Sequence, residues 1–171
     1  MKKVITLGVS VFLFFACVTP NAVKTDKSAI RKEVNTLLVN WHKAASDANF
    51  KEYFGVLDSS AIYIGTAAEE IWTKEKFANF SKPYFDKGKA WSFTTLERNI
   101  YMSESANIVW FDELIDTWMG TCRGSGVLQK KGDSWKIKQY VLSVAIPNDD
   151  IQAVIDIKKK NDSIFLKKYQ K

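Results

Sequence analysis

The feature that most constrains the fold is a run of alternating apolar and polar residues from Trp110 to Asn148, interrupted by two short turns at Gly120 and at residues 131–133. Alternation with a period of two is typical of strands that bury one face. A glycine between two such segments indicates a tight reversal of the chain. The run therefore predicts consecutive antiparallel strands, and one of their faces carries a Glu, an Arg and a Gln inside an otherwise apolar wall.

Helical patterns precede this sheet. Apolar residues recur at helical spacing over residues 27–47, which predicts a long amphipathic helix. Asn49 and Glu52 have the spacing of a capping pair and predict a second, short helix. Thr73 is placed to cap a third helix, and Pro83 is expected to break or restart it.

Alternation and turn residues give the other elements. The predicted strands are residues 61–64, 91–102, 106–119, 121–130 and 134–146, and a closing helix is expected over about 150–160. Helices followed by a long antiparallel meander are typical of an α+β domain in which the helices cover one face of a curved sheet.

The N-terminus has the charge order of a bacterial secretory signal. Lys2 and Lys3 precede an uncharged apolar segment, residues 4–16, which is too short to span a bilayer. Ala16 followed by Cys17 resembles a lipobox, in which the Cys thiol takes the lipid and becomes the mature N-terminus.

This order predicts a signal peptide over residues 1–16 and a tether over residues 17–26. The protein is then an exported lipoprotein, anchored to a membrane through Cys17, in the periplasm or at the cell surface. Phe14 and Phe15 are bulkier than the usual lipobox residues. A signal cleaved elsewhere, an uncleaved anchor and an apolar first helix of the domain are the alternatives.

Charge and cysteine content narrow the function classes. Lys2 and Lys3 account for two of the six net positive charges, which leaves +4 after cleavage, much of it in the C-terminal helix and basic tail of residues 149–171. An exported chain rarely meets nucleic acid, so this tail is expected to be solvated or to face a membrane. Lipidation of Cys17 leaves Cys122 without a disulfide partner. Neither thiol has metal-type spacing, and no metal or cofactor is expected.

The order of these elements is similar to that of the nuclear transport factor 2-like superfamily, and most of all to its SnoaL-like and ketosteroid-isomerase-like branches. The residues that carry the resemblance are FGVLDSSAIYI at 54–64, Gly124-x-Gly126, and Trp135-x-Ile137 running to Ser143. The resemblance covers residues 27–148. It implies a cystatin-like cone, with N-terminal helices packed on a curved, mainly antiparallel sheet that encloses a pocket. The superfamily includes isomerases, cyclases, dehydratases and binding or assembly modules, so the fold leaves the function open.

Strand pairing predicts which side chains face this pocket. Pairing about the turn at residues 131–133 puts Arg123 on the face of Trp135, and pairing about Gly120 adds Glu113 to the same face. A buried carboxylate needs a partner, and Arg123 is the expected one. A slip of one residue would instead put Trp110, Asp112 and Asp116 inside. The residues predicted to line the pocket are Trp41, Phe54, Tyr63, Trp91, Phe111, Glu113, Arg123, Gln139 and Val141.

The opposite face of the sheet is predicted to be apolar, which on an exported domain indicates a partner surface. Its large residues are Trp110, Trp118, Tyr140 and Leu142. The resemblance implies a homodimer through this face, and coverage by the C-terminal helix is the alternative.

Glu113, Asp58 and His42 are the candidates for acid–base chemistry, because a carboxylate in an apolar pocket suits proton transfer. Each has a structural alternative: an ion pair with Arg123 for Glu113, an Asx turn for Asp58 and a helix-edge position for His42. Many relatives carry a histidine where this chain has Val141, which argues against catalysis. The first hypothesis is a lipid-anchored domain that binds a small, mostly apolar ligand or assembles with itself. The alternative is an isomerase, cyclase or dehydratase acting on an apolar carbonyl compound.

Overall fold

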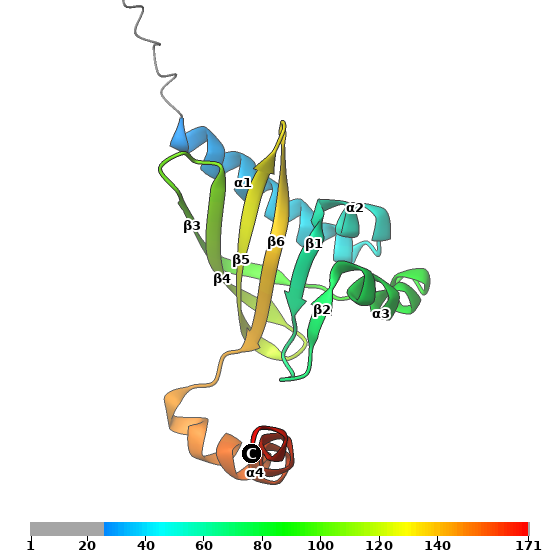
Figure 1. Ribbon diagram of the computed structural model, residues 1–171, viewed down its shortest axis with the longest axis vertical. Coiled ribbons are helices and arrows are strands. Elements are labelled where there is room, and N and C mark those ends of the chain that lie inside the picture. The colour runs from blue at the N-terminus through cyan, green and yellow to red at the C-terminus, as the bar shows by residue number, and fades with distance from the viewer. Residues whose placement is uncertain (1–25, 171) are drawn as a thin grey trace, which may run out of the picture.

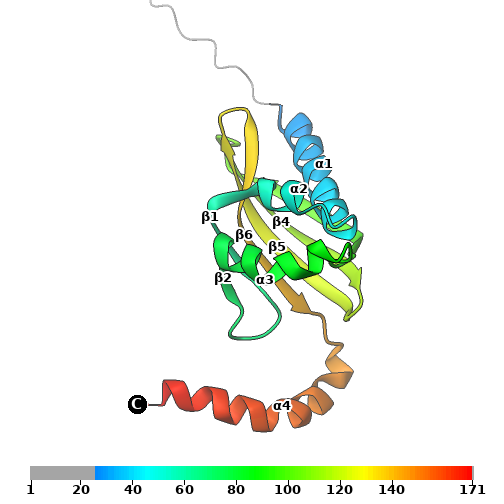
Figure 2. The same ribbon diagram turned by 90° about the vertical axis from the view of Figure 1, so that its right-hand side faces the viewer.

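The computed structural model describes residues 26–170. The predicted signal peptide, Cys17 and most of the predicted tether lie outside these residues. Three helices lie on one side of a strongly curved sheet, and a fourth helix lies apart from it, beyond one end of the strands (Figures 1 and 2). The prediction of an α+β domain with N-terminal helices on a curved sheet is confirmed.

Three helices cover the sheet, and the second and third begin at the predicted caps. They are α1 (Lys27–Ser46), α2 (Phe50–Val56) and α3 (Lys74–Asp86). The Asn49 side chain accepts a hydrogen bond from the backbone N–H of Glu52 at the start of α2, and Thr73 accepts one from Lys76 at the start of α3. Each cap satisfies a backbone donor that the first turn of a helix leaves without a partner.

The sheet has six strands in the described part of the chain, in the order β2-β1-β6-β5-β4-β3. β1 and β6 are parallel, and the other neighbours are antiparallel. The strands are β1 (Leu57–Ile64), β2 (Ile71–Thr73), β3 (Thr94–Met102), β4 (Ile108–Thr117), β5 (Gly120–Lys131) and β6 (Ser134–Val144). The concave face of this sheet and α1, α2 and α3 enclose the core.

The elements differ from the sequence prediction at three places. β2 was not predicted, and β1 starts four residues before the predicted strand at 61–64. α3 continues through Pro83, because its buried Phe77 and Phe85 on either side of the proline hold both halves against the core. Packing of an apolar face outweighs the one backbone hydrogen bond that a proline removes.

The register of β4, β5 and β6 is also not the predicted one. The turn between β4 and β5 lies at Trp118 and Met119, not at Gly120, so Glu113 pairs with Gly124. Between β5 and β6 the register shifts between Val127 and Leu128, because β6 carries one extra residue, Lys138. A register change of one residue moves the inward-facing side chains of a strand to the outer face of the sheet, and the outward-facing ones inward.

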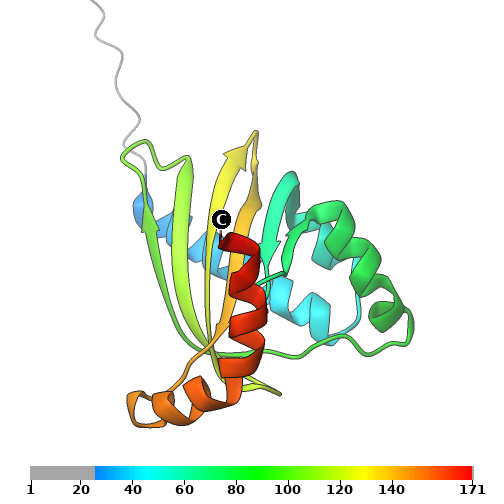
Figure 3. The ribbon, with the colours of Figure 1, turned by 60° about the horizontal axis from the view of Figure 1, so that its bottom comes forward.

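The last helix, α4 (Ile151–Leu166), follows a 3₁₀ turn at Asn148–Asp150 and is longer than the predicted helix. None of its residues is buried. It crosses beneath the end of the sheet, and its C-terminal end approaches the β1–β2 connection (Figure 3), where Lys168 Nζ lies 3.9 Å from Glu69 Oε1.

Candidate functional site

A fully buried carboxylate, that of Glu113, lies in the middle of the domain. Its Oε2 accepts hydrogen bonds from Arg98 Nε at 2.9 Å and Arg98 Nη2 at 2.6 Å. Its Oε1 accepts from the Tyr140 hydroxyl at 2.9 Å and lies 2.9 Å from His42 Nε2. The four groups come from α1, β3, β4 and β6, so this cluster ties the first helix to the sheet.

The arginine of this cluster is fixed on all sides. The Arg98 side chain is only 3% exposed, and besides Glu113 it donates to Asn35 Oδ1 and Thr95 Oγ1, each at 3.0 Å. Both nitrogens bind the same carboxylate oxygen, and hydrogen bonds between two charged groups are stronger than neutral ones.

Electrostatics keep the buried carboxylate ionised. Burial raises the pKa of Glu113, but His42 and Arg98 outweigh this effect and hold the pKa below its usual value. An ionised carboxylate only accepts hydrogen bonds, so His42 Nε2 carries the proton in this contact. The Tyr140 phenol has a pKa well above its usual value, because of burial and of the neighbouring Glu113 charge. The carboxylate thus accepts four hydrogen bonds from the protein, two on each oxygen.

The prediction that Arg123 pairs with Glu113 is wrong, because the register of β5 puts Arg123 on the outer face. Its side chain is 56% exposed and lies 3.8 Å from Asp112 Oδ1. Gln139 and Val141 are likewise on the outer face and not in the pocket. The slipped alternative is also wrong, since Asp112 and Asp116 face outward.

Sequence reasoning missed Arg98, the true partner of Glu113. Arg98 is the one basic residue in β3, the strand that pairs with β4, and Arg98 and Glu113 are direct cross-strand partners. A lone arginine in the strand next to a buried glutamate was the available signal. The register shift between Thr95 and Glu97 obscured the alternation of β3.

Asp58 is buried at the opposite end of the sheet from the tip of the β1–β2 connection. Its carboxylate binds Lys131 Nζ at 2.5 Å and Lys138 Nζ at 3.1 Å, and it accepts from the backbone N–H and the hydroxyl of Ser60. Lys131 above all, and then Ser60, lower the pKa of Asp58 far below its usual range. Asp58 thus ties β1 to the end of β5 through Lys131 and to β6 through Lys138, and it forms the Asx-type contact that the sequence suggested.

A pocket opens between β1, α3, the segment before β3 and the β4–β5 turn, and we call it the aromatic pocket. Its volume is about 150 Å³, and it includes Tyr63 and Trp91 of the predicted lining. Seven of its lining residues are aromatic: Tyr63, Trp72, Phe77, Phe80, Trp91, Phe93 and Trp118. Trp41, Phe54 and Phe111, which were predicted to line a pocket, are buried in the core and do not reach it.

The aromatic pocket and the Glu113 cluster are separate. Glu113 and His42 do not line the pocket. Phe93 lies between the two, because it lines the pocket and its ring also packs edge-on against His42 at a centroid distance of 5.8 Å. A ligand in the pocket would therefore meet aromatic rings and not the buried carboxylate.

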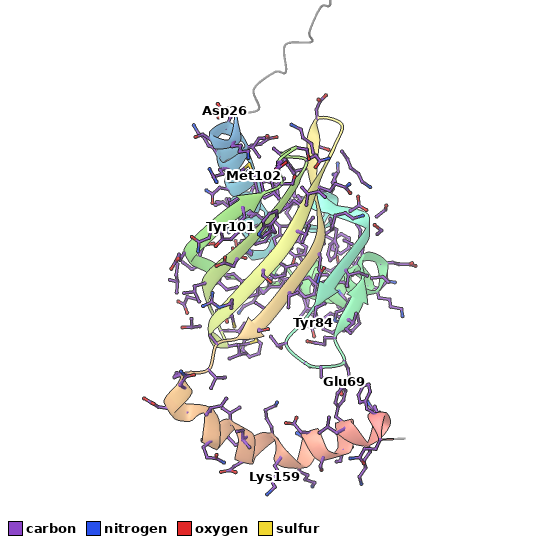
Figure 4. All side chains as sticks on the ribbon, turned by 60° about the vertical axis from the view of Figure 1, so that its left-hand side comes forward. Asp26, Glu69, Tyr84, Tyr101, Met102 and Lys159 are labelled. Carbon is purple, nitrogen blue, oxygen red and sulfur yellow. The ribbon has the colours of Figure 1, made fainter. Side chains whose placement is uncertain are left out.

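The outer face of the sheet has fewer large apolar residues than predicted. Tyr140 and Leu142 are buried on the inner face, and Trp118 lies in the β4–β5 turn, so their placement on the outer sheet face is wrong. Trp110 does lie there, 45% exposed, and its ring stacks on that of Tyr101 of β3 at a centroid distance of 6.1 Å. Tyr101 is labelled in Figure 4. These two rings form the apolar centre of the outer face.

In residues 26–170, no group of three His, Cys, Asp or Glu side chains is placed to hold a metal ion. Among the same residues, no helix has the length and apolar character needed to cross a membrane. Cys122 is buried in β5 as a free thiol.

Comparison with known proteins gives a family and a fold. A family model described as a SnoaL-like domain matches residues 34–147, more than half of the chain. No curated protein matches the sequence.

Solved structures resemble the domain at low sequence identity. An NTF2-like protein of unknown function from Pseudomonas putida is 11% identical, with a TM-score of 0.60 over 71% of this chain and 91% of its own. The association domain of CaMKII from C. elegans is 18% identical, with a TM-score of 0.57 over 68% and 97%. A protein of unknown function with a cystatin-like fold from Nostoc punctiforme is 11% identical, with a TM-score of 0.55 over 67% and 90%. At these identities the likeness shows the fold alone.

Proposed function

Since the chain belongs to the SnoaL-like domain family, we propose that it is an exported, lipid-anchored binding domain that holds a small ligand in the aromatic pocket. In this proposal the domain does no acid–base chemistry at Glu113. Ligand sites are typically concave and lined by apolar and aromatic side chains with a few polar groups, and the aromatic pocket has this composition.

The saturation of Glu113 is the observation that carries the proposal. A general base needs a lone pair directed at the proton it takes, and its pKa must lie near the working pH. Both oxygens of Glu113 are occupied by donors from the protein, and its pKa is lowered. Asp58 is likewise paired with lysines and has a lowered pKa. These groups suit a structural role better than proton transfer.

We also propose that the domain forms a homodimer through the outer face of the sheet, centred on Trp110 and Tyr101. Two stacked, half-exposed rings on one strand pair are an apolar surface that a partner would cover. The association domains among the similar structures supply the precedent for assembly by this fold.

Native mass spectrometry of the protein purified from its own host tests both proposals at once. The wild type is expected as a dimer that carries extra mass, and the extra mass should be lost on denaturation. Trp118→Ala removes a ring from the pocket mouth and is expected to release the ligand but keep the dimer. Trp110→Glu puts a charge on the outer face and is expected to give a monomer that keeps the ligand.

Each variant is therefore the control for the other, because Trp118 and Trp110 are both largely exposed and neither supports the core. A wild type without extra mass contradicts the ligand proposal. A wild type that is monomeric at high concentration contradicts the dimer.

The lipid anchor is tested separately. Replacing Cys17 with Ser removes the only thiol in the predicted lipobox, so the protein is expected to move from the membrane fraction to the soluble fraction and to lose the mass of the lipid. Cys122→Ser is the matched control, since that thiol is buried in the domain and its loss should leave the fractionation unchanged. Membrane association that survives Cys17→Ser with no change in mass would reject the anchor.

A further inference from the structure

The aromatic pocket has one charged residue in its lining, and that residue is acidic. Glu70 stands among seven aromatic residues, and no lysine or arginine lines the pocket. A pocket for an anion would need a cationic side chain in this position. The charge of this pocket instead complements a cation.

The Glu70 carboxylate has no cation partner in the part of the chain that the structure describes. Its Oε2 accepts one hydrogen bond, from the backbone N–H of Ala67 at 3.0 Å. The side chain folds back over Gly65, where a Cβ atom would lie 2.3 Å from Oε2. Its charge reaches the pocket wall, because after burial it is the main cause of the raised pKa of Tyr63.

Several rings of the pocket stack on one another, and none of the pocket rings has a cation of its own in residues 26–170. Tyr63 stacks on Phe77 at 3.9 Å, and Trp72 stacks on Phe80 at 5.1 Å. The cation–π contacts of residues 26–170 involve Phe50, Trp135 and Phe165, none of which lines the pocket. Aromatic faces attract cations, Trp most strongly, and cages of such rings recognise quaternary ammonium groups.

We infer that the aromatic pocket binds a small organic cation with a methylated ammonium group, and that Glu70 is its counter-ion. This inference rests on the proposed function and specifies the ligand class. The volume of about 150 Å³ is below the range of roughly 300–1,000 Å³ typical of drug-sized ligands, so the ligand has few heavy atoms. Trp118, 82% exposed at the mouth, supplies a ring that such a ligand would cover.

The test compares choline with 3,3-dimethylbutan-1-ol, which has the same shape but a neutral carbon in place of the nitrogen. Each is titrated into the full chain while NMR follows the indole N–H signals of Trp72, Trp91 and Trp118, with Trp110 and Trp135 as internal controls. Choline is expected to shift only the pocket signals and to bind about 10- to 30-fold more tightly than the neutral alcohol, which is the size of a desolvated cation–π contact.

Glu70→Gln keeps the shape and the hydrogen bond to Ala67 but removes the charge. It is expected to weaken choline binding about 10-fold and to leave the alcohol unaffected. Glu69→Gln is the matched control, because Glu69 does not line the pocket and faces Lys168. It should change neither affinity.

The outcomes separate this inference from the proposed function. If the alcohol binds as tightly as choline, or if Glu70→Gln leaves choline binding unchanged, the cation assignment is overturned while the pocket remains a ligand site. If neither compound shifts the pocket signals at concentrations well above millimolar, the inference is also overturned. The native mass measurement then decides the proposed function by itself.

Discussion

Glu113→Gln is expected to lower the free energy of unfolding by about 3–5 kcal/mol, because it leaves the Arg98 guanidinium buried without its counter-ion. For a domain of this size the melting temperature should fall by roughly 6–20 °C. Asp112→Asn is the matched control. It removes the same charge one residue away on the outer face, where the contact with Arg123 is long and exposed, and it should have little effect.

Double-mutant cycles identify the partner of Glu113. Glu113→Gln combined with Arg98→Met should lose clearly less stability than the sum of the single losses, because the second change removes the unpaired charge. Glu113→Gln combined with Arg123→Met should be additive. Coupling to Arg123 and additivity with Arg98 would show that the strands pair in the predicted register and not in the observed one.

The stability that Glu113 contributes depends on pH in a definite direction. The folded-state pKa of Glu113 is lowered, so its contribution to stability is present above the unfolded-state pKa of about 4.3 and is lost as the pH falls through the folded-state pKa. The difference in unfolding free energy between the wild type and Glu113→Gln should therefore be full at neutral pH and shrink below about pH 4. Chemical denaturation at several pH values measures it.

Gly126→Ala is expected to lower the free energy of unfolding by about 1–3 kcal/mol, through overpacking. A Cβ atom at this position would lie 2.6 Å from the backbone oxygen of Gln139 and 2.7 Å from Cε1 of Phe111. The backbone oxygen cannot rotate away, so β5 and β6 must separate. Thermal or denaturant unfolding monitored by circular dichroism measures the loss.

Gly55→Ala is the control, and its expected effect has the opposite sign. Gly55 lies in α2, and a Cβ atom there would meet no atom within 4 Å. Alanine is favoured over glycine inside a helix by roughly 0.5–1 kcal/mol, so this variant should be more stable than the wild type. If Gly126→Ala is as well tolerated as Gly55→Ala, the close packing of β5 on Phe111 is refuted.

The sequence was sufficient for the positions of the helices and of every strand except β2, because these depend on local signals. The caps at Asn49 and Thr73 and the periodicity of α1 needed no tertiary information. The inward position of Glu113 also followed from its own strand, where it alternates with Phe111 and Ile115.

The partners of Glu113 did not follow, because they depend on how strands pair. An error of one residue in a turn reverses the faces of a whole strand. The turn at Trp118 and Met119 has no strong turn signal, and the extra residue Lys138 shows no mark in the sequence. Because these two features were not predicted, Arg123 and Gln139 were assigned to the wrong face. For the same reason the close approach of Gly124 to Tyr140 was not predicted.

We expect the parallel pairing of β1 with β6 to form late in folding. The contact between Asp58 and Lys138 spans 80 residues, and that between His42 and Glu113 spans 71. Contacts of such long separation form late, since the chain must close a large loop before they give any stability. The meander from β3 to β6 is local and is free to form first. β1 therefore lacks its parallel neighbour until β6, the last strand, has formed. If the chain is exported as proposed, the sheet is completed only when nearly the whole domain has crossed the membrane.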